Sequence, residues 1–213
     1  MPIDATSPIP NLSSGIKLML MPLLFINLVG KSPRDIINKG ISMSFIPEDR
    51  LGMGLVASMG MVDNLLLKDY HKQKGIFIDR KPVIEKAKKM VDQFEIKTPD
   101  IYHPIKYLSG GNIQKILVGR ELSMYPKILI MAYAVRGLDI NTCYTIYDLI
   151  SKEKANGTAI LFIGEDLDVL MELCDKIMVL CHGEVTGIVD AKLASREKIG
   201  MMMVGNSVDE GAI

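Results

Sequence analysis

A short serine- and glycine-rich segment in the middle of the chain carries the residues best suited to chemistry. It reads LSGGNIQ over residues 108–114 and opens a predicted helix over residues 110–124. Glycine lets a backbone approach a ligand closely, and the amides at a helix start are unpaired, so such a segment suits a phosphate group. The same residues also fit a plain helix cap followed by a glycine turn. Ser109, Gly110 and Gly111 alone do not separate these two interpretations.

Short apolar strands and helices alternate around this segment, and they must position it. Ser32 suits a helix N-cap, Pro33 the first helical position and Gly40 a helix end. Predicted strands cover residues 41–46, 128–132, 159–163, 177–181 and 185–189, and predicted helices cover residues 61–70, 82–94, 110–124, 140–150, 167–173 and 195–203. The alternation predicts crossover connections and a parallel sheet with helices on its faces, interrupted by a helical insertion after the first strand.

The composition excludes several classes of function. The 213 residues include 25 Lys+Arg and 25 Asp+Glu, so the formal net charge of zero argues against nucleic-acid binding through bulk positive charge. Cys143, Cys174 and Cys181 show no CxxC spacing, which predicts reduced thiols in a cytosolic protein rather than a disulfide framework or a zinc site. The longest apolar stretch, residues 18–29, is shorter than the roughly 20 residues of a membrane-spanning helix.

Several motifs in the right order resemble those of ABC transporter ATPases. The run LSGGNIQK resembles the signature motif, RGLD at residues 136–139 resembles the D-loop, and PEDR at residues 47–50 resembles the Q-loop region, with Glu48 where the family usually has glutamine. The residues of these motifs most resemble those in the second, C-terminal ATPase half of importers for simple sugars and nucleosides. The resemblance implies an α/β, P-loop NTPase-like fold in which a parallel sheet carries a helical subdomain.

The composition and the motifs together predict three parts of the chain. Residues 1–31 form an irregular, unassigned N-terminal segment, residues 32–205 an ABC-ATPase-like domain with its helical subdomain at about 51–107, and residues 206–213 a tail. A phosphate loop (Walker A) reads GxxxxGK[ST], and Gly30-Lys31-Ser32 matches only its end because Phe25 stands where the first glycine is required. We therefore expect the fold to lack the Walker A strand-loop-helix at its N-terminus, with the genuine loop upstream of residue 1 or lost.

Three further positions depart from the family pattern. Ala132 and Tyr133 stand where Walker B carboxylates would hold magnesium and position the attacking water, and Glu165 stands at the H-loop histidine. A methyl group and a phenol cannot replace carboxylates as magnesium ligands, so we expect weak or no ATP hydrolysis by this chain alone. We assign no catalytic residue and no metal ligand, and we interpret Glu165, Asp166 and Asp168 as an acidic helix start rather than a metal cluster.

The resemblance implies roles for the remaining motif residues. In the family, ATP lies between two ATPase domains, and the signature of one contacts the terminal phosphate held by the other. Asp139 would cross the interface between the two domains, and Glu48 would lie at the boundary that senses nucleotide and communicates with the membrane subunit. The residues implied at the signature are Ser109, Gly110, Gly111, Asn112 and Gln114, the last less certainly in contact.

Together these expectations define an ATP-binding component of an ABC importer for simple sugars or nucleosides, acting peripherally at the cytoplasmic face of the membrane. ATP and Mg²⁺ would be held mainly by a homologous partner ATPase half. The other partners implied are transmembrane permease subunits and, indirectly, a solute-binding protein, but no nucleic acid. Two alternatives remain open at this point: a non-catalytic interaction or regulatory module, and a truncated remnant of such a subunit.

Overall fold

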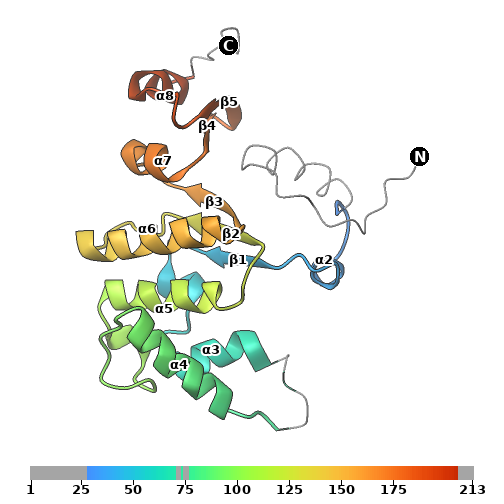
Figure 1. The fold of residues 1–213 in the computed structure, drawn as a ribbon, viewed down its shortest axis with the longest axis vertical. Helices are drawn as coiled ribbons and strands as arrows, with labels where there is room; N and C mark the ends of the chain where they lie inside the picture. The colour runs from blue at the N-terminus through green and yellow to red at the C-terminus, as the bar shows by residue number, and fades with distance from the viewer. Residues whose placement is uncertain (1–27, 71–72, 74–76, 206–213) are drawn as a thin grey trace. The chain divides into compact units, whose positions relative to one another are not determined.

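The computed structural model describes residues 28–70, 73 and 77–205 (Figure 1). The chain divides into two compact units, Met1–Gly40 and Ile41–Ile213. The predicted N-terminal segment 1–31 lies mostly outside the described residues, and the predicted tail 206–213 lies wholly outside them.

The described part of the first unit contains a short helix, α2 (Pro33–Asn38). The Ser32 side chain accepts a hydrogen bond from the Asp35 amide, and the Asp35 side chain accepts one from the Ser32 amide, which is a complete capping box. Gly40 follows the helix with a positive φ of 75°. The predicted cap, first-turn proline and glycine end are all confirmed.

A three-stranded parallel sheet lies at the centre of the second unit. It consists of β1 (Met43–Ile46), β2 (Ile128–Ala132) and β3 (Ala159–Ile163), in the order β1-β2-β3. The register pairs Phe45 with Ile130, and Ile130 with Leu161. Short apolar runs of this kind form buried parallel strands, as the sequence predicts.

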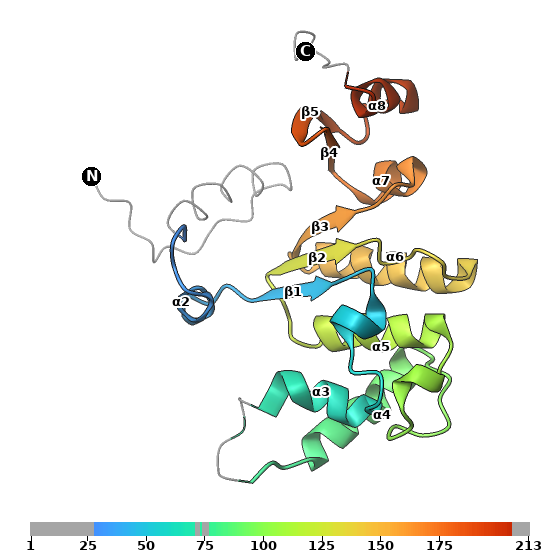
Figure 2. The same ribbon diagram turned by 180° about the vertical axis from the view of Figure 1, so that it is seen from behind.

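Helices α5 (Gly110–Leu122) and α6 (Ile140–Ala155) lie on the same side of this sheet, as both ribbon views show (Figure 2). Leu117 of α5, Leu129 of β2 and Ile146 of α6 are completely buried between these elements. A further helix, α7 (Leu167–Leu173), follows β3. The start of α5 is thereby fixed by a core that includes the sheet.

The opposite face of the sheet is apolar and exposed. On β1, Met43 and Phe45 are 62% and 42% exposed, and on β3, Leu161 and Ile163 are 48% and 40% exposed. Parallel sheets are ordinarily covered on both faces because helical crossovers lie on each side. The predicted parallel sheet with helices packed on it is confirmed, and within the described residues of the second unit α5 and α6 cover one of its faces.

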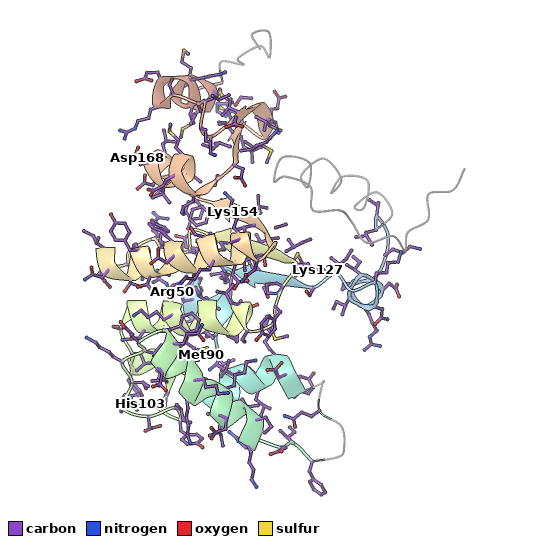
Figure 3. The ribbon with its side chains drawn as sticks, in the orientation of Figure 1. Arg50, Met90, His103, Lys127, Lys154 and Asp168 are labelled. Atoms are coloured by element: carbon purple, nitrogen blue, oxygen red, sulfur yellow. The ribbon has the colours of Figure 1, made fainter. Side chains whose placement is uncertain are left out.

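The segment between β1 and α5 is helical, as predicted. It contains a π-helical turn, η1 (Arg50–Gly54), then α3 (Met61–Asp69), α4 (Lys81–Gln93) and a 3₁₀ turn, η3 (Ile105–Tyr107). The α4 helix packs tightly on α5, since a Cβ added at Gly119 would lie 2.6 Å from the Sδ atom of Met90 (Figure 3). The helical segment is thus attached to the same helix whose first turn carries the glycines.

The last two strands form a separate sheet. β4 (Lys176–Cys181) and β5 (Glu184–Asp190) pair antiparallel, joined by His182 and Gly183 at positive φ values of 50° and 84°. A two-residue turn of this type joins antiparallel neighbours, so the tight turn that the sequence predicts at residues 182–184 is confirmed, and the strand order places this pair apart from the parallel sheet as a hairpin of its own.

The final helix, α8 (Arg196–Met203), is capped by Ser195 as predicted. It packs on the β4–β5 hairpin, and the two share an apolar cluster that includes Ile177, Val179, Ile199 and Met202. Among the described residues, no helix is long and apolar enough to cross a membrane.

Candidate functional site

The first turn of α5 is built by Ser109 and Asn112. Ser109 is the N-cap, and its Oγ accepts hydrogen bonds from the Asn112 amide at 3.4 Å and from Asn112 Nδ2 at 2.8 Å. The Asn112 Oδ1 atom accepts a hydrogen bond from the Lys97 amide at 2.8 Å, which ties the helix start to the chain before it. The cap interpretation of Ser109 is therefore confirmed, and the cap leaves the amides of the first turn at the surface.

Gly110 and Gly111 differ in what surrounds them. A Cβ added at Gly110 would meet only Arg50 Nη1, at 3.6 Å. A Cβ at Gly111 would lie 3.1 Å from Thr142 Oγ1 and 3.4 Å from Asp139 Oδ2. Gly111 thus permits the close approach of α5 to the start of α6, whereas Gly110 borders open space in which a ligand can approach the helix start.

Asp139 is brought next to this helix start although it lies 28 residues later in the chain than Gly111. It is the N-cap of α6, and its carboxylate accepts hydrogen bonds from the Thr142 amide at 3.0 Å and from Thr142 Oγ1 at 2.8 Å. These bonds favour the charged form and lower the pKa of Asp139 below its ordinary value of 3.8. The start of α6 is therefore held by a carboxylate that remains ionised at neutral pH.

We expect Asp139 to stabilise the fold in a pH-dependent way. Because its pKa is lower in the folded state than in the unfolded state, the contribution is present above the unfolded pKa and is lost as the pH falls through the folded pKa. The asparagine introduced in the D139N variant would cap the helix without titrating. The difference in unfolding free energy between wild type and D139N should be constant above about pH 5 and should change as the pH falls toward about 3. A pH-independent difference in urea titrations would contradict this.

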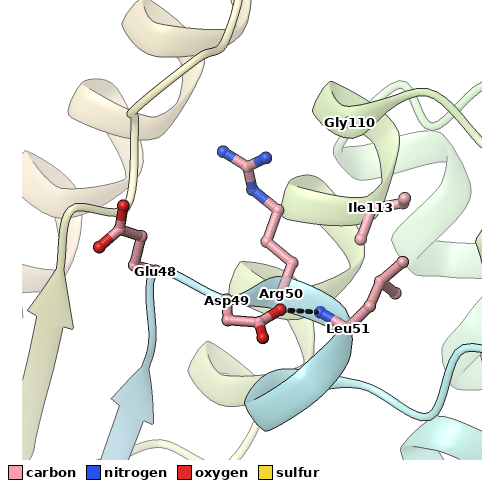
Figure 4. A pocket seen from close by; sticks show the side chains of 6 residues that line it. All are labelled: Glu48, Asp49, Arg50, Leu51, Gly110 and Ile113. Atoms are coloured by element: carbon pink, nitrogen blue, oxygen red, sulfur yellow. Dashed lines mark hydrogen bonds between the residues drawn. The ribbon is translucent and has the colours of Figure 1, made fainter.

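A hollow of about 240 Å³ lies between the turn η1 and the start of α5 (Figure 4). In the figure, the Asp49 carboxylate turns back onto the Leu51 amide, so it caps the turn instead of facing the hollow. The residues that line the hollow are Glu48, Asp49, Arg50, Leu51, Gly110 and Ile113. The predicted Q-loop and signature segments are therefore neighbours.

A charged side chain from the predicted D-loop segment faces Glu48. Arg136 Nη1 donates a hydrogen bond to Glu48 Oε1 at 2.7 Å, and Arg136 Nε lies 4.0 Å from Glu165 Oε1. All three side chains are about half exposed or more, so these ion pairs are individually weak. One arginine thus lies between the carboxylates that stand at the predicted Q-loop and H-loop positions.

Solved structures of similar architecture identify the fold. A dimeric ATP-binding cassette in a post-hydrolysis state with ADP and phosphate superposes with a TM-score of 0.63 at 19% identity, over 76% of this chain and 69% of that one. A nucleotide-free cassette from an ABC transporter gives a TM-score of 0.59 at 22% identity, over 84% of this chain and 71% of that one. The chain has the fold of an ABC ATPase.

The similarity extends to sequence. The chain is 34% identical over 169 residues to the xylose import ATP-binding protein of Moorella thermoacetica, covering 79% of this chain and 33% of that protein. It is 35% identical over 170 residues to a ribose import ATP-binding protein of Rhodopirellula baltica, again over 79% and 33%. It is 31% identical over 183 residues to the guanosine import ATP-binding protein of Bacillus subtilis, over 84% and 35%.

The chain is therefore a relative of the ATP-binding proteins of sugar and nucleoside importers, and it spans about a third of the length of the relatives it matches. No family model matches the chain. The α/β fold and the resemblance inferred from the motifs are both confirmed.

In this ABC ATPase fold, the last residue of β2 and the residue after it lie at the carboxyl edge of the sheet but offer no carboxylate. Ala132 ends β2, and Tyr133 follows with a positive φ of 50° and donates its amide to the Ile163 carbonyl at 2.9 Å. The Tyr133 ring lies 5.9 Å from the guanidinium carbon of Arg136. Within the described residues, no group of three or more His, Cys, Asp or Glu could hold a metal ion. This donor set does not fit Mg²⁺.

Arg50, Arg136 and Thr142 bind residues of the predicted site but were missed by the sequence analysis. Arg50 and Arg136 belong to the PEDR and RGLD segments, and their closeness in sequence to Glu48 and Asp139 was the signal that could have identified them. Their partners lie 64 to 88 residues away in the sequence, and no local pattern reports such contacts. The three acidic residues after β3 bind different partners. Glu165 lies near Arg136, Asp166 caps α7, and Asp168 pairs with Arg196.

Proposed function

We propose that this chain supplies a signature segment to ATP held by a partner ATPase half, as part of an importer for a simple sugar or a nucleoside. The observation that carries the proposal is the open first turn of α5, where Ser109 caps the helix and Gly110 borders open space. Exposed amides and the positive end of a helix dipole favour a phosphate group, so these residues fit the terminal phosphate of ATP.

The proposed contacts with the phosphate come from Ser109, Gly110 and Gly111, while Asn112 and Gln114 shape the helix behind them. Asn112 is already bonded to Ser109 and Lys97, and Gln114 is fully buried, so these two act by holding the turn. Asp139, held rigidly at the start of α6, is proposed to reach the partner half. Bound ATP would supply the phosphoryl group that the partner transfers to water.

The partner half must provide the parts that this chain lacks. Ala132 and Tyr133 cannot hold Mg²⁺, so the metal and the attacking water are proposed to be bound by the partner. The ATP-binding relatives named above are import proteins, which supports a place beside permease subunits at the cytoplasmic face of the membrane. We propose that residues 51–107 form the subdomain that faces the permease and that residues 32–205 form the ATPase-like domain.

Mixing this chain with an intact ATPase half that carries its own phosphate loop tests the proposal. The chain alone should neither bind nor hydrolyse MgATP measurably. The mixture should associate when ATP is added, as followed by light scattering, and should hydrolyse ATP faster than the partner alone. Hydrolysis by the isolated chain would contradict the assignment of Ala132 and Tyr133, and a mixture that ignores ATP would contradict the signature role.

A second candidate is a non-catalytic interaction module that keeps the fold without using nucleotide. The arrangement of Arg136 between Glu48 and Glu165 favours it, because two carboxylates at this edge repel a phosphate group. Stoichiometric binding to a permease at equal affinity with and without ATP would support this candidate. Binding that strengthens with ATP would support the signature donor.

A further inference from the structure

Arg50 lies where three segments of the proposed site meet. It opens the turn η1 directly after Asp49, whose Oδ1 accepts hydrogen bonds from the Leu51 and Gly52 amides at 3.2 and 2.8 Å. The neighbouring carboxylate is thus occupied by the backbone. Among the described residues, no carboxylate forms an ion pair with Arg50, so its guanidinium group is not held by a counter-ion.

The guanidinium group instead binds two neutral oxygens on separate segments. Arg50 Nε donates to Gln114 Oε1 at 2.9 Å, and Arg50 Nη2 donates to the main-chain carbonyl of Arg136. Gln114 lies on α5 just behind the signature glycines, and Arg136 begins the D-loop segment. A planar guanidinium can serve two acceptors in fixed directions at once, which a lysine ammonium cannot do with the same geometry.

The side chain of Gln114 forms its one hydrogen bond in the described structure with Arg50. It is completely buried, its Oε1 accepts from Arg50, and its Nε2 has no hydrogen-bond partner. A buried amide with an unpaired donor lowers stability, and an apolar side chain of similar size would avoid that loss. Packing alone therefore does not account for a glutamine here, whereas an acceptor for Arg50 does.

The connection between the segments runs in both directions. The main chain of Arg136 accepts from Arg50, and the side chain of Arg136 donates to Glu48, two residues before Arg50. Segments 48–50 and 136–139 are thus joined by two separate contacts, and Gln114 attaches α5 to the same point. These links connect three segments that are far apart in the sequence.

We infer that Arg50 is a positioning residue that fixes the spacing between the signature segment, residues 109–114, and the D-loop segment, residues 136–139. It does so through Gln114 and the Arg136 carbonyl, without touching the reacting atoms. The spacing matters because both segments must reach the same partner half, so the inference rests on the proposed function. Arg50 acts within this chain, so its effect is measurable without the partner.

Amide hydrogen exchange in the isolated chain gives the first test. In R50K, the amides of Ile113, Arg136 and Leu138, all hydrogen-bonded in the structure, should exchange about tenfold faster than in wild type. The amide of Phe94, which ends α4 and donates to the Met90 carbonyl, should be unchanged. The control R196K, at an exposed arginine paired with Asp168, should change none of them. Unchanged exchange at Arg136 and Leu138 in R50K would overturn the inference.

A rescue variant separates positioning from general loosening. Q114M should raise exchange at Arg136 and Leu138 as R50K does, although the hydrogen bond that it removes joins residue 114 to Arg50 and not to the D-loop segment. In the double variant R50K/Q114E, the new carboxylate can pair with the lysine, so exchange at Ile113 should return to within about twofold of wild type. Exchange at Arg136 and Leu138 should stay raised, because the paired ammonium does not also hold the Arg136 carbonyl. Failure of Q114M to affect the D-loop amides would also overturn the inference.

The mixture with an intact ATPase half tests the functional consequence. R50K should lower the maximal ATP turnover of the mixture about tenfold while leaving the ATP concentration for half-maximal rate unchanged, because the nucleotide is held by the partner. If the wild-type mixture is inactive but the exchange results hold, the proposed function fails and the positioning role stands. If the wild-type mixture is active and R50K equals it in turnover and in exchange, only the positioning role fails.

Discussion

The variant G110A is expected to fold as well as wild type and yet to lose about a hundredfold of the ATP turnover measured with a partner half. The structure supplies the first part, because a Cβ at position 110 meets only Arg50 Nη1, at an ordinary contact distance of 3.6 Å. Alanine also restricts the unfolded chain more than glycine does. The second part follows because the added methyl group occupies the space through which a phosphate reaches the helix start.

The matched control for this variant is G200A. Gly200 lies in α8, and an added Cβ there meets no atom within 4 Å. Both variants should unfold at the same or a slightly higher urea concentration than wild type, but only G110A should lose ATP-dependent association and turnover. Normal turnover by a folded G110A would show that the first turn of α5 does not approach the phosphate.

The variant E121A is expected to lose about 3–5 kcal/mol of unfolding free energy, measured by urea titration. Glu121 is completely buried and contacts two cations: Arg120, with 2.8 Å between Arg120 Nη2 and Glu121 Oε1, and Lys68, with 3.1 Å between Lys68 Nζ and Glu121 Oε2. Arg120 is itself buried, and its other partner is the Gly54 carbonyl at 2.7 Å. Removing the carboxylate leaves a buried guanidinium without a counter-ion.

The control E85A distinguishes this buried network from an ordinary ion pair. Glu85 pairs with Lys88 on the surface of α4, and its side chain is 65% exposed. Its removal should change the unfolding free energy by less than about 0.5 kcal/mol. The double variant R120M/E121L, which replaces the pair with apolar side chains, should regain most of the stability lost in E121A. Equal effects of E121A and E85A would contradict the buried-network explanation.

The elements of the fold could be predicted where local physics decides them. Ile128–Ala132 and Ala159–Ile163 are short apolar runs bounded by turn residues, and Ser109 and Ser195 are caps whose side chains bond within their own helix turn. Each signal is contained in fewer than about ten residues, so the sequence alone reports it.

The relations between elements could not be predicted in the same way. The two bonds of Arg50 span 64 and 86 residues. The turn between β4 and β5 is a local signal, but no local pattern tells that this hairpin stays out of the parallel sheet. Nothing in the apolar pattern of β1 or β3 tells which face a helix will cover. The site was located by its motifs, but its internal support was visible only in three dimensions.

The apolar face of the parallel sheet that α5 and α6 leave open, within the described residues of the second unit, makes the stability of this fold depend on its surroundings. Fully burying a large apolar side chain contributes roughly 1.5–3 kcal/mol, and Met43, Phe45, Leu161 and Ile163 are all partly exposed to water. Because these side chains are already about half buried, covering all four would add roughly half of the full-burial value for each, which is still a sizeable fraction of the roughly 5–15 kcal/mol that holds a typical domain together. By mass action, any polypeptide that binds this face shifts the folding equilibrium in proportion to its own abundance. The lifetime of the chain in a cell is thereby coupled to the supply of whatever covers this face.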